Sequence, residues 1–330
     1  MGCGASTATP SRQLVLLGGG ECGKTTIFKQ IQILHGSGFD EDTRREWVHA
    51  IHSSVQRSMK VLVPALEQFG QKVAPDAEAA CTEVLSQEFQ AKRSISPEQC
   101  EQIKRVYTDP AVQAMIGNRA QGRQLDLDDN ALYFLHKLDE LCAPGYLPTV
   151  EDILKVRDAT RTVEALDFQY GPAKFRVIDV GGQRMERPKW NLTGDITAVI
   201  FVSSLIEYDQ KLREDVEQNR LKESLHLFDI ACNRRYPDKP ILLFLNKVDL
   251  FKEKIKHTDL KVCFPTYKGG CDCEAALEYI KWKFTSVRRD ETKKIYIMET
   301  TATDTKNMEF IFKSMMDIVE KSNLAQSGMG

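Results

Sequence analysis

The chain has 330 residues, 42% hydrophobic and 28% charged, which is enough for one large globular domain or two of ordinary size. Its net charge of −2 gives no reason to expect a nucleic-acid partner, and no apolar run reaches the roughly 18 residues that a membrane-spanning helix needs. The N-terminus lacks the pattern of a secretory signal, and the nine cysteines are scattered without paired spacing, which indicates reduced thiols.

The first residues, MGCGAS, fit the pattern of an N-myristoylation site. Gly2 is the expected acceptor, and Cys3 is placed for palmitoylation. Two acyl chains give stable membrane attachment, whereas one gives only marginal binding. We therefore expect residues 1–12 to form a lipidated segment that binds the membrane surface.

A phosphate-binding loop follows at once. QLVLL, at 13–17, is short and apolar and predicts a buried strand, and IFKQIQIL beyond the loop has helical spacing. Between them GGGECGKT, at 18–25, matches the pattern G-x-x-x-x-G-K-[ST]. Its backbone N–H groups would surround phosphates, Lys24 would reach the β- and γ-phosphates, and the Thr25 hydroxyl would bind magnesium. By itself the loop leaves ATPases and kinases open.

The middle of the chain reads as almost entirely helical. Apolar residues recur every three or four positions from Trp47 to Phe69. Thr43 with Glu46, and Ser96 with Gln99, are candidate capping boxes. We expect residues 39–154 to form an all-helical domain inserted into an α/β domain.

From about Thr162 the pattern alternates between strand and helix. The expected strands are FRVIDV, AVIFV, ILLFLN and IYIMET, and the expected helices are Asp209–Cys232, Cys273–Val287 and Met308–Leu324. Such alternation predicts a doubly wound, mainly parallel sheet. The expected fold is therefore an α/β P-loop nucleotide-binding domain at 13–38 and 155–330, with the helical domain inserted.

The motif NKVD, at 246–249, follows one of the apolar strands and suggests how a base is selected. The Asp249 carboxylate can accept from N1–H and the 2-amino group of guanine, whereas adenine offers neither donor there. The stem of Lys247 can lie over the base. After the last strand, the Ala302 N–H within TTAT could read the guanine carbonyl oxygen.

The motif DVGGQ, at 179–183, follows another strand. Asp179 suits magnesium, directly or through water. Gly182 allows a backbone N–H to approach the γ-phosphate, and Gln183 can orient a water molecule for in-line attack.

Taken together, GGGECGKT, DVGGQRMERPKW, NKVD and TTATDTKN, with DILKVRDAT at 152–160, resemble heterotrimeric G-protein α subunits. The resemblance implies that Arg157 stabilises charge on the γ-phosphate and that Thr160 joins Thr25 on Mg²⁺. It also implies that the α/β domain is a P-loop GTPase domain and that Glu21 pairs with the Arg157 region. Gly182 and Arg184–Trp190 resemble the second switch segment of the family. The implied catalytic residues are Gln183, Arg157, Lys24 and Glu21.

The nucleotide-binding residues expected from the motifs and the resemblance share one ligand, GTP or GDP. They come from the phosphate loop, the helical domain, the stretch that lines the ribose, the two switches and the base-reading loops. They are Gly20, Glu21, Cys22, Gly23, Lys24, Thr25, Thr26, Asp129, Asn130, Leu154, Lys155, Val156, Arg157, Thr160, Gly182, Asn246, Lys247, Asp249, Thr301, Ala302 and Thr303.

The resemblance also implies partners: a seven-helix receptor, effectors and GTPase-activating proteins, at the cytoplasmic face of the plasma membrane. The family usually has a long N-terminal helix that binds the βγ dimer, but only about ten residues separate Cys3 from Gln13. Met185 and Pro188 are unusual in the second switch, Ala159–Thr162 departs from the first, and the C-terminal tail lacks the cysteine often found there. We therefore expect weak or absent βγ binding.

The expected function is a slow, magnesium-dependent GTPase switch in transmembrane-receptor signalling, with hydrolysis abolished by Gln183→Leu or Arg157→Cys. Two alternatives stay open: a GTP-binding scaffold with negligible hydrolysis, and a GTPase switch that works without βγ. An ATP-dependent kinase is disfavoured by Asp249.

Overall fold

The computed structural model describes residues 11–86, 94–118, 125–157, 163–192, 195–212 and 214–326. It divides into two compact units, one formed by Met1–Gly38 with Ala159–Gly330 and the other by Phe39–Asp158. The second boundary lies a few residues later than expected. The reason is that Val156 is 4% exposed and packs in the core of the helical unit, so residues 155–156 do not belong to the GTPase domain.

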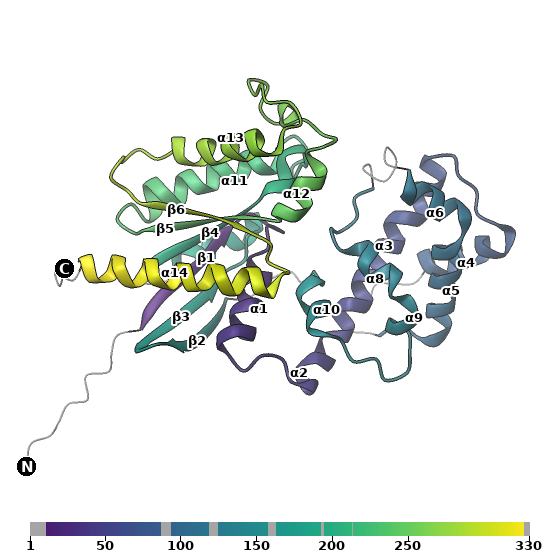
Figure 1. Ribbon diagram of the computed structural model, residues 1–330. Helices are drawn as coiled ribbons and strands as arrows, with labels where there is room; N and C mark the ends of the chain where they lie inside the picture. The colour runs from purple at the N-terminus through teal and green to yellow at the C-terminus, as the bar shows by residue number, and fades with distance from the viewer. Residues whose placement is uncertain are drawn as a thin grey trace, which may run out of the picture. The chain divides into compact units, whose positions relative to one another are not determined.

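The first unit is built on a six-stranded sheet in the order β2-β3-β1-β4-β5-β6 (Figure 1). All neighbouring strands pair in parallel except β2, which is antiparallel to β3. The strands are β1 (Arg12–Gly18), β2 (Glu164–Tyr170), β3 (Ala173–Asp179), β4 (Ala198–Ser204), β5 (Ile241–Asn246) and β6 (Ile295–Thr300). The doubly wound, mainly parallel sheet is therefore confirmed, and β2 is an edge strand that the sequence analysis missed.

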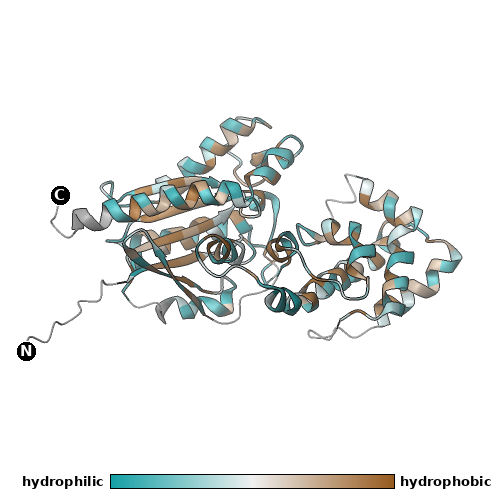
Figure 2. Ribbon diagram, turned by 60° about the horizontal axis from the view of Figure 1, so that its bottom comes forward, coloured by the Kyte–Doolittle hydropathy of each residue, from teal (hydrophilic) through white to brown (hydrophobic). Residues whose placement is uncertain are grey.

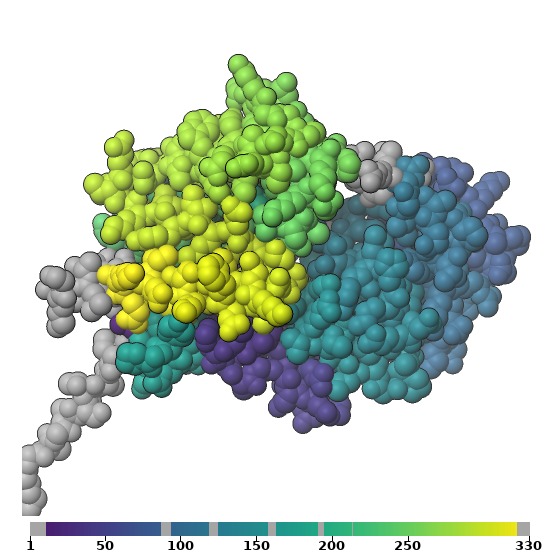
Figure 3. Space-filling view, viewed as in Figure 1, coloured from purple at the N-terminus to yellow at the C-terminus, as the bar shows by residue number. Residues whose placement is uncertain are grey.

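Helices cover both faces of this sheet, because each central strand is apolar on both sides. On β1, Leu14 and Leu16 pack towards α1 (Lys24–His35) and α14 (Thr305–Gln326). Val15 and Leu17 pack towards α11 (Arg220–Asp229) and α13 (Cys273–Ser286) on the other face. Hydropathy colouring shows apolar strands with polar outer helix surfaces (Figure 2). The outer side of α14 lies at the surface of this unit (Figure 3).

The remaining helices of this unit lie in the connections that follow the strands β3, β4 and β5. They are α11 (Arg220–Asp229), α12 (Val248–Lys254) and α13 (Cys273–Ser286), with the 3-10 helices η1 (Arg184–Leu192), η2 (Leu205–Asp209) and η4 (Leu260–Val262) and the π-helix η3 (Ile230–Arg235). The helix expected over Asp209–Cys232 is wrong at its start. Asn219 caps α11 through a bond from the Lys222 N–H, so the chain before it forms η2 and a loop.

The second unit is all-helical, as expected from its apolar spacing. Its helices are α2 (Glu41–Glu46), α3 (Val48–Gln68), α4 (Pro75–Ser86), α5 (Pro97–Thr108), α6 (Pro110–Gly117), α8 (Ala131–His136), α9 (Leu138–Leu141) and α10 (Val150–Lys155). Ser96 and Gln99 form the expected capping box of α5. The box expected at Thr43 is wrong, because Asp40 caps α2 by accepting from the Thr43 N–H.

The expectation of reduced thiols is wrong for two cysteines. Cys100 of α5 and Cys142, just after α9, form a disulfide across the core of the helical unit, with Cα atoms 5.9 Å apart. They are 42 residues apart, so no local spacing reveals the pair. In the described part of the chain, none of the helices is both long and apolar enough to cross a membrane.

Candidate functional site

The candidate site lies at the carboxyl ends of the parallel strands. β1 lies between β3 and β4, so the loops that leave these strands diverge to opposite faces of the sheet, and ligands of open α/β sheets bind at such a point. The segments that leave β1, β3, β5 and β6 are the four motifs found in the sequence. The fold therefore brings together segments that lie up to about 280 residues apart in the chain.

The phosphate loop wraps closely around its own lysine. Lys24 is 5% exposed, and its ammonium donates to Gly19 O at 2.6 Å and Gly18 O at 3.2 Å. Gly23 has a φ of 105°, and a Cβ there would overlap Asn246 Nδ2. A side chain at residue 23 would thus be disfavoured by backbone conformation and by space, which explains the glycine of the motif.

Thr25 and Asp179 meet across the site. Thr25 lies in the first turn of α1, and Asp179 is the last residue of β3. The Thr25 hydroxyl donates to Asp179 Oδ2 at 3.0 Å. Asp179 is fully buried. A hydroxyl and a carboxylate are the hard oxygen ligands that Mg²⁺ prefers, so these two side chains fit a magnesium ion.

The segment after β3 packs directly on the phosphate loop. A Cβ on Gly182 would lie 2.6 Å from Gly18 O and would overlap Lys24 Nζ and Gly19 O. Gln183 is exposed, and a Cβ on Gly20 would lie 3.4 Å from its Cγ. Glycine at residue 182 therefore allows the second switch segment to touch the loop.

Side chains of η1 fix this segment from the other side. The Trp190 indole N–H donates to Gly181 O at 3.0 Å, and Arg187 Nε donates to Gly182 O at 3.3 Å. Arg187 also donates to Glu223 of α11 at 2.6 Å. The backbone of Gly181 and Gly182 is thus connected through η1 to α11.

Asn246, at the end of β5, joins three loops. Its Nδ2 donates to Cys22 O at 2.9 Å, while its Oδ1 accepts from Ala302 N at 3.0 Å and from the Thr300 hydroxyl at 3.2 Å. The Ala302 N–H that we expected to face guanine is thus bonded to Asn246 here. Gln30, a buried residue that the motifs did not reveal, holds Ala302 O at 2.9 Å.

The other base-reading residues follow Asn246. Lys247 has a φ of 62°, and its ammonium donates to Glu21 O at 2.8 Å. Asp249, in the first turn of α12, accepts from the Thr301 hydroxyl at 3.3 Å. The fold thus brings the Asp249 carboxylate to the 300–303 loop, where both could meet one base.

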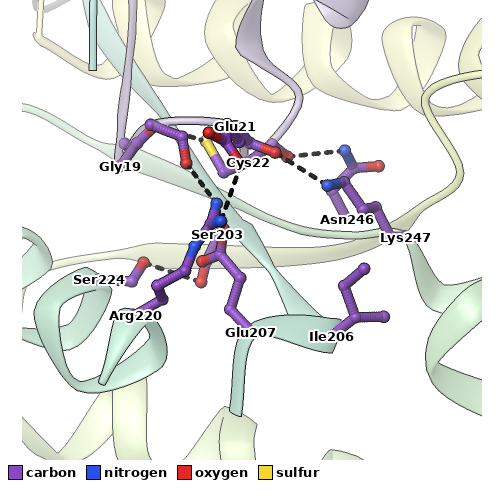
Figure 4. Close-up of polar contacts among 12 residues, drawn as sticks. Gly19, Glu21, Cys22, Ser203, Ile206, Glu207, Arg220, Ser224, Asn246 and Lys247 are labelled. Atoms are coloured by element: carbon purple, nitrogen blue, oxygen red, sulfur yellow. Dashed lines mark hydrogen bonds and ion pairs between the residues drawn. The ribbon is translucent and has the colours of Figure 1, made fainter. Parts of the chain in front are cut away.

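Sequence reasoning missed a partly buried ion-pair cluster beside the phosphate loop. Arg220, at the start of α11, donates to Glu207 at 2.7 Å, to Gly20 O at 2.8 Å and to Glu21 at 2.8 Å (Figure 4). Burial lowers the pKa of Arg220, but the carboxylates of Glu207 and Glu21 raise it by more. The one sequence signal was an acidic residue just after the buried strand β4.

In the helical unit, Arg157 lies two residues after the end of α10, next to the C-cap residue Val156. Its Nη1 donates to Asp128 Oδ1 at 2.6 Å. Asn130 Nδ2 donates to Lys155 O at 3.0 Å, and the Lys155 ammonium lies over the ring of Tyr133. Because the Val156 side chain is in the core, this stretch would offer a ribose its backbone.

Asp152 anchors α10. It is fully buried and accepts from the hydroxyls of Tyr133 and Tyr146, from the Lys137 ammonium and from the Thr149 N–H, all at 2.7–2.8 Å. Burial raises the pKa of Asp152, but these four bonds lower it by more, so the pKa falls to about 2.

Replacing Asp152 with asparagine is expected to destabilise the helical unit by about 3 kcal/mol, because one amide oxygen cannot serve four donors and Lys137 loses the buried one of its two carboxylate partners. Hydrogen exchange of α8 and α10 peptides measures this loss of stability.

The stability of the helical unit should also depend on pH. Since the folded-state pKa of Asp152 is depressed, its contribution to the free energy of unfolding is complete above about pH 4 and lost as pH falls towards 2. Asp139→Asn, at an exposed ion pair, should change neither quantity; equal losses in both variants would contradict the prediction.

The remaining predicted residues are placed as follows. Cys22 is buried, and Gly20, Thr26, Leu154 and Thr303 lie in or beside the segments above, while Asp129 is exposed next to Asn130. Gly2, Cys3 and Thr160 lie outside the described residues. The pairing of Glu21 with the Arg157 region stays a prediction.

Comparison with known proteins identifies the family of this chain. Residues 5–319 match the model of the G-protein alpha subunit. The chain is 41% identical to the guanine nucleotide-binding protein alpha-2 subunit of Dictyostelium discoideum, over 96% of this chain and 90% of that one. It is 38% identical to the alpha-15 subunit of Caenorhabditis briggsae, over 97% and 90%, and 38% identical to the G(o) subunit alpha of Locusta migratoria, over 96% and 90%. The chain therefore belongs to the G-protein alpha subunit family, whose members are GTP-binding signalling switches and GTPases.

Proposed function

We propose that this chain hydrolyses GTP slowly, with Mg²⁺, as a switch that responds to a transmembrane receptor. The observation that carries the proposal is the contact between Gly182 and the phosphate loop. A second-switch backbone that touches Lys24 and Gly19 can respond to a γ-phosphate bound in that loop. Hydrolysis would remove this interaction, so the switch would relax in the GDP form.

Thr25 and Asp179 would hold the magnesium ion, and Thr160 would join them when GTP is bound. The ion would offset negative charge on the β- and γ-phosphates. Lys24 would leave the carbonyls of Gly18 and Gly19 to bind phosphate oxygens. The support for this assignment is the bond between Thr25 and the fully buried Asp179.

Hydrolysis would depend on position and charge rather than on covalent chemistry. Gln183 would orient the attacking water, since it is the exposed side chain directly after Gly182, and its Cγ lies where a Cβ on Gly20 would meet it at 3.4 Å. Arg157 would stabilise charge on the γ-phosphate, the role that family membership gives it. Glu21, which Arg220 and Lys247 hold, would set the shape of the loop.

Guanine would be read by Asp249, which would accept from N1–H and the 2-amino group, with the Lys247 stem over the base. The bond between Ala302 N–H and Asn246 means that reading of the guanine oxygen by this N–H would require sharing the donor. The proximity of Asp249 and Thr301 supports a base site between these two loops.

We also propose attachment to the cytoplasmic face of the plasma membrane through acylation of Gly2 and Cys3. Receptors, effectors and GTPase-activating proteins are proposed partners, as is general in the family. Weak binding of a βγ dimer stays a prediction.

Replacing Gln183 with leucine is expected to slow single-turnover hydrolysis of GTP at least about 100-fold, because leucine cannot orient water. Chelation of Mg²⁺ is expected to stop hydrolysis by the wild-type chain. Release of labelled phosphate from preloaded protein measures both effects.

Binding of a non-hydrolysable GTP analogue should be nearly unchanged in Gln183→Leu, and excess ATP should not displace it. If the wild-type chain binds GTP but releases no phosphate with Mg²⁺, it is a scaffold rather than a hydrolysing switch. If ATP competes equally well, the guanine assignment fails.

A further inference from the structure

The segment that carries Arg157 is held in place by contacts within the helical unit itself. Val156 is anchored in the core, and Asn130 holds Lys155 O at 3.0 Å. Asp128 lies two residues before Asn130, and Arg157 lies two residues after Lys155. The Arg157 side chain donates to the Asp128 carboxylate at 2.6 Å. Residues 128–130 and 155–157 are thus joined at both ends.

Arg57 completes the arrangement from α3. Its Nε lies 3.5 Å from Asp128 Oδ2, and its Nη2 donates to the backbone oxygen of Arg157 at 3.4 Å. Asp128 thus contacts each of the two guanidinium groups with one oxygen. Arg57 contacts the backbone of Arg157, and Asp128 contacts its side chain. The Asp128 side chain is 12% exposed and that of Arg157 is 24% exposed, so solvent screens the pair only partly.

The charges of the three residues also matter. An arginine paired with one aspartate would be nearly neutral towards an anionic phosphate. Because Arg57 shares the same carboxylate, the group of two guanidinium ions and one carboxylate keeps a net charge of about +1 at neutral pH. Asp128 can therefore hold Arg157 without cancelling the positive charge of the group.

We propose that Asp128 and Arg57 are positioning residues for Arg157 in GTP hydrolysis. They fix its backbone and rotamer beforehand, so that less side-chain freedom is lost when the guanidinium binds the γ-phosphate in the transition state. This inference rests on the proposed role of Arg157.

The test is a double-mutant cycle on the full chain, measured as single-turnover GTP hydrolysis with Mg²⁺. Asp128→Asn is expected to lower the rate constant about tenfold, while binding of a non-hydrolysable GTP analogue changes less than about twofold. In the Arg157→Cys background, Asp128→Asn is expected to have almost no further effect, because it acts through Arg157. Arg57→Gln should slow hydrolysis similarly, and Arg57→Lys should restore most of the rate.

Asp139→Asn is the matched control, since it breaks the Lys104–Asp139 pair elsewhere in the helical unit and should leave the rate unchanged. An equal effect of Asp128→Asn in both backgrounds would show a general role in folding and would overturn the inference. A wild-type rate in Asp128→Asn together with a slow Arg157→Cys would overturn the inference alone. A wild-type rate in Arg157→Cys would overturn the proposed function as well.

Discussion

Replacing Arg157 with cysteine is expected to slow single-turnover GTP hydrolysis at least about 10³-fold, a magnitude taken from arginine fingers of this protein family. The transferred phosphoryl group carries negative charge that a neutral thiol cannot stabilise. Because Arg157 is the residue after the anchored Val156, its removal should leave the helical core intact. Binding of GTP should therefore survive the change, and the loss should lie in the chemical step.

The measurement is phosphate release from protein preloaded with GTP, started by Mg²⁺. Arg45→Cys provides the matched control, since Arg45 forms two exposed ion pairs within the same unit, to Glu41 and Asp42. We expect a wild-type rate there. Equal rates for Arg157→Cys and the wild-type chain would remove Arg157 from the mechanism.

Replacing Gly182 with alanine is expected to lower affinity for a GTP analogue, relative to GDP, about 100-fold. The added methyl would lie 2.6 Å from Gly18 O and would overlap Gly19 O, and neither backbone oxygen can move away freely. Lys24 can shift its flexible side chain, but the loop carbonyls are fixed in the fold. Overpacking of this kind costs about 3 kcal/mol, which corresponds to that factor.

Equilibrium binding of fluorescent GTP and GDP analogues measures the ratio. GDP affinity should fall less, because Gly182 is expected to face the γ-phosphate that GDP lacks. Gly117→Ala is the control, since a Cβ there meets no atom within 4 Å. Equal losses for both nucleotides would indicate a damaged loop rather than a lost γ-phosphate contact.

The central strands and the phosphate loop could be predicted because their signals are local. Buried parallel strands are continuous apolar runs, and each of the expected runs proved to be a strand. β2 was missed because it is an edge strand with mostly exposed or half-buried residues. The start of α11 was misplaced because Asn219 caps the helix, and of the apolar residues shortly before it Leu212 is buried whereas Val216 is exposed, so they do not continue one helix face.

The supporting contacts of the site could not be predicted, because they join residues that no spacing relates. Arg220 meets Glu21 across 199 positions, and Gln30 meets Ala302 across 272. The motifs identify residue types that suit phosphate, metal or guanine. They do not show which side chains hold those residues in place, and the Ala302 N–H is an example of a predicted contact with another partner.

The disulfide between Cys100 and Cys142 has a consequence for the denatured chain. It closes a covalent ring that contains Asp128 and Asn130, across a separation of 42 residues. A ring of that size removes configurational entropy from the unfolded ensemble worth about 4 kcal/mol in the loop-closure model. The disulfide therefore stabilises the segment that holds Arg157 by restricting the unfolded chain. This effect adds to the contacts that the segment makes in the folded state.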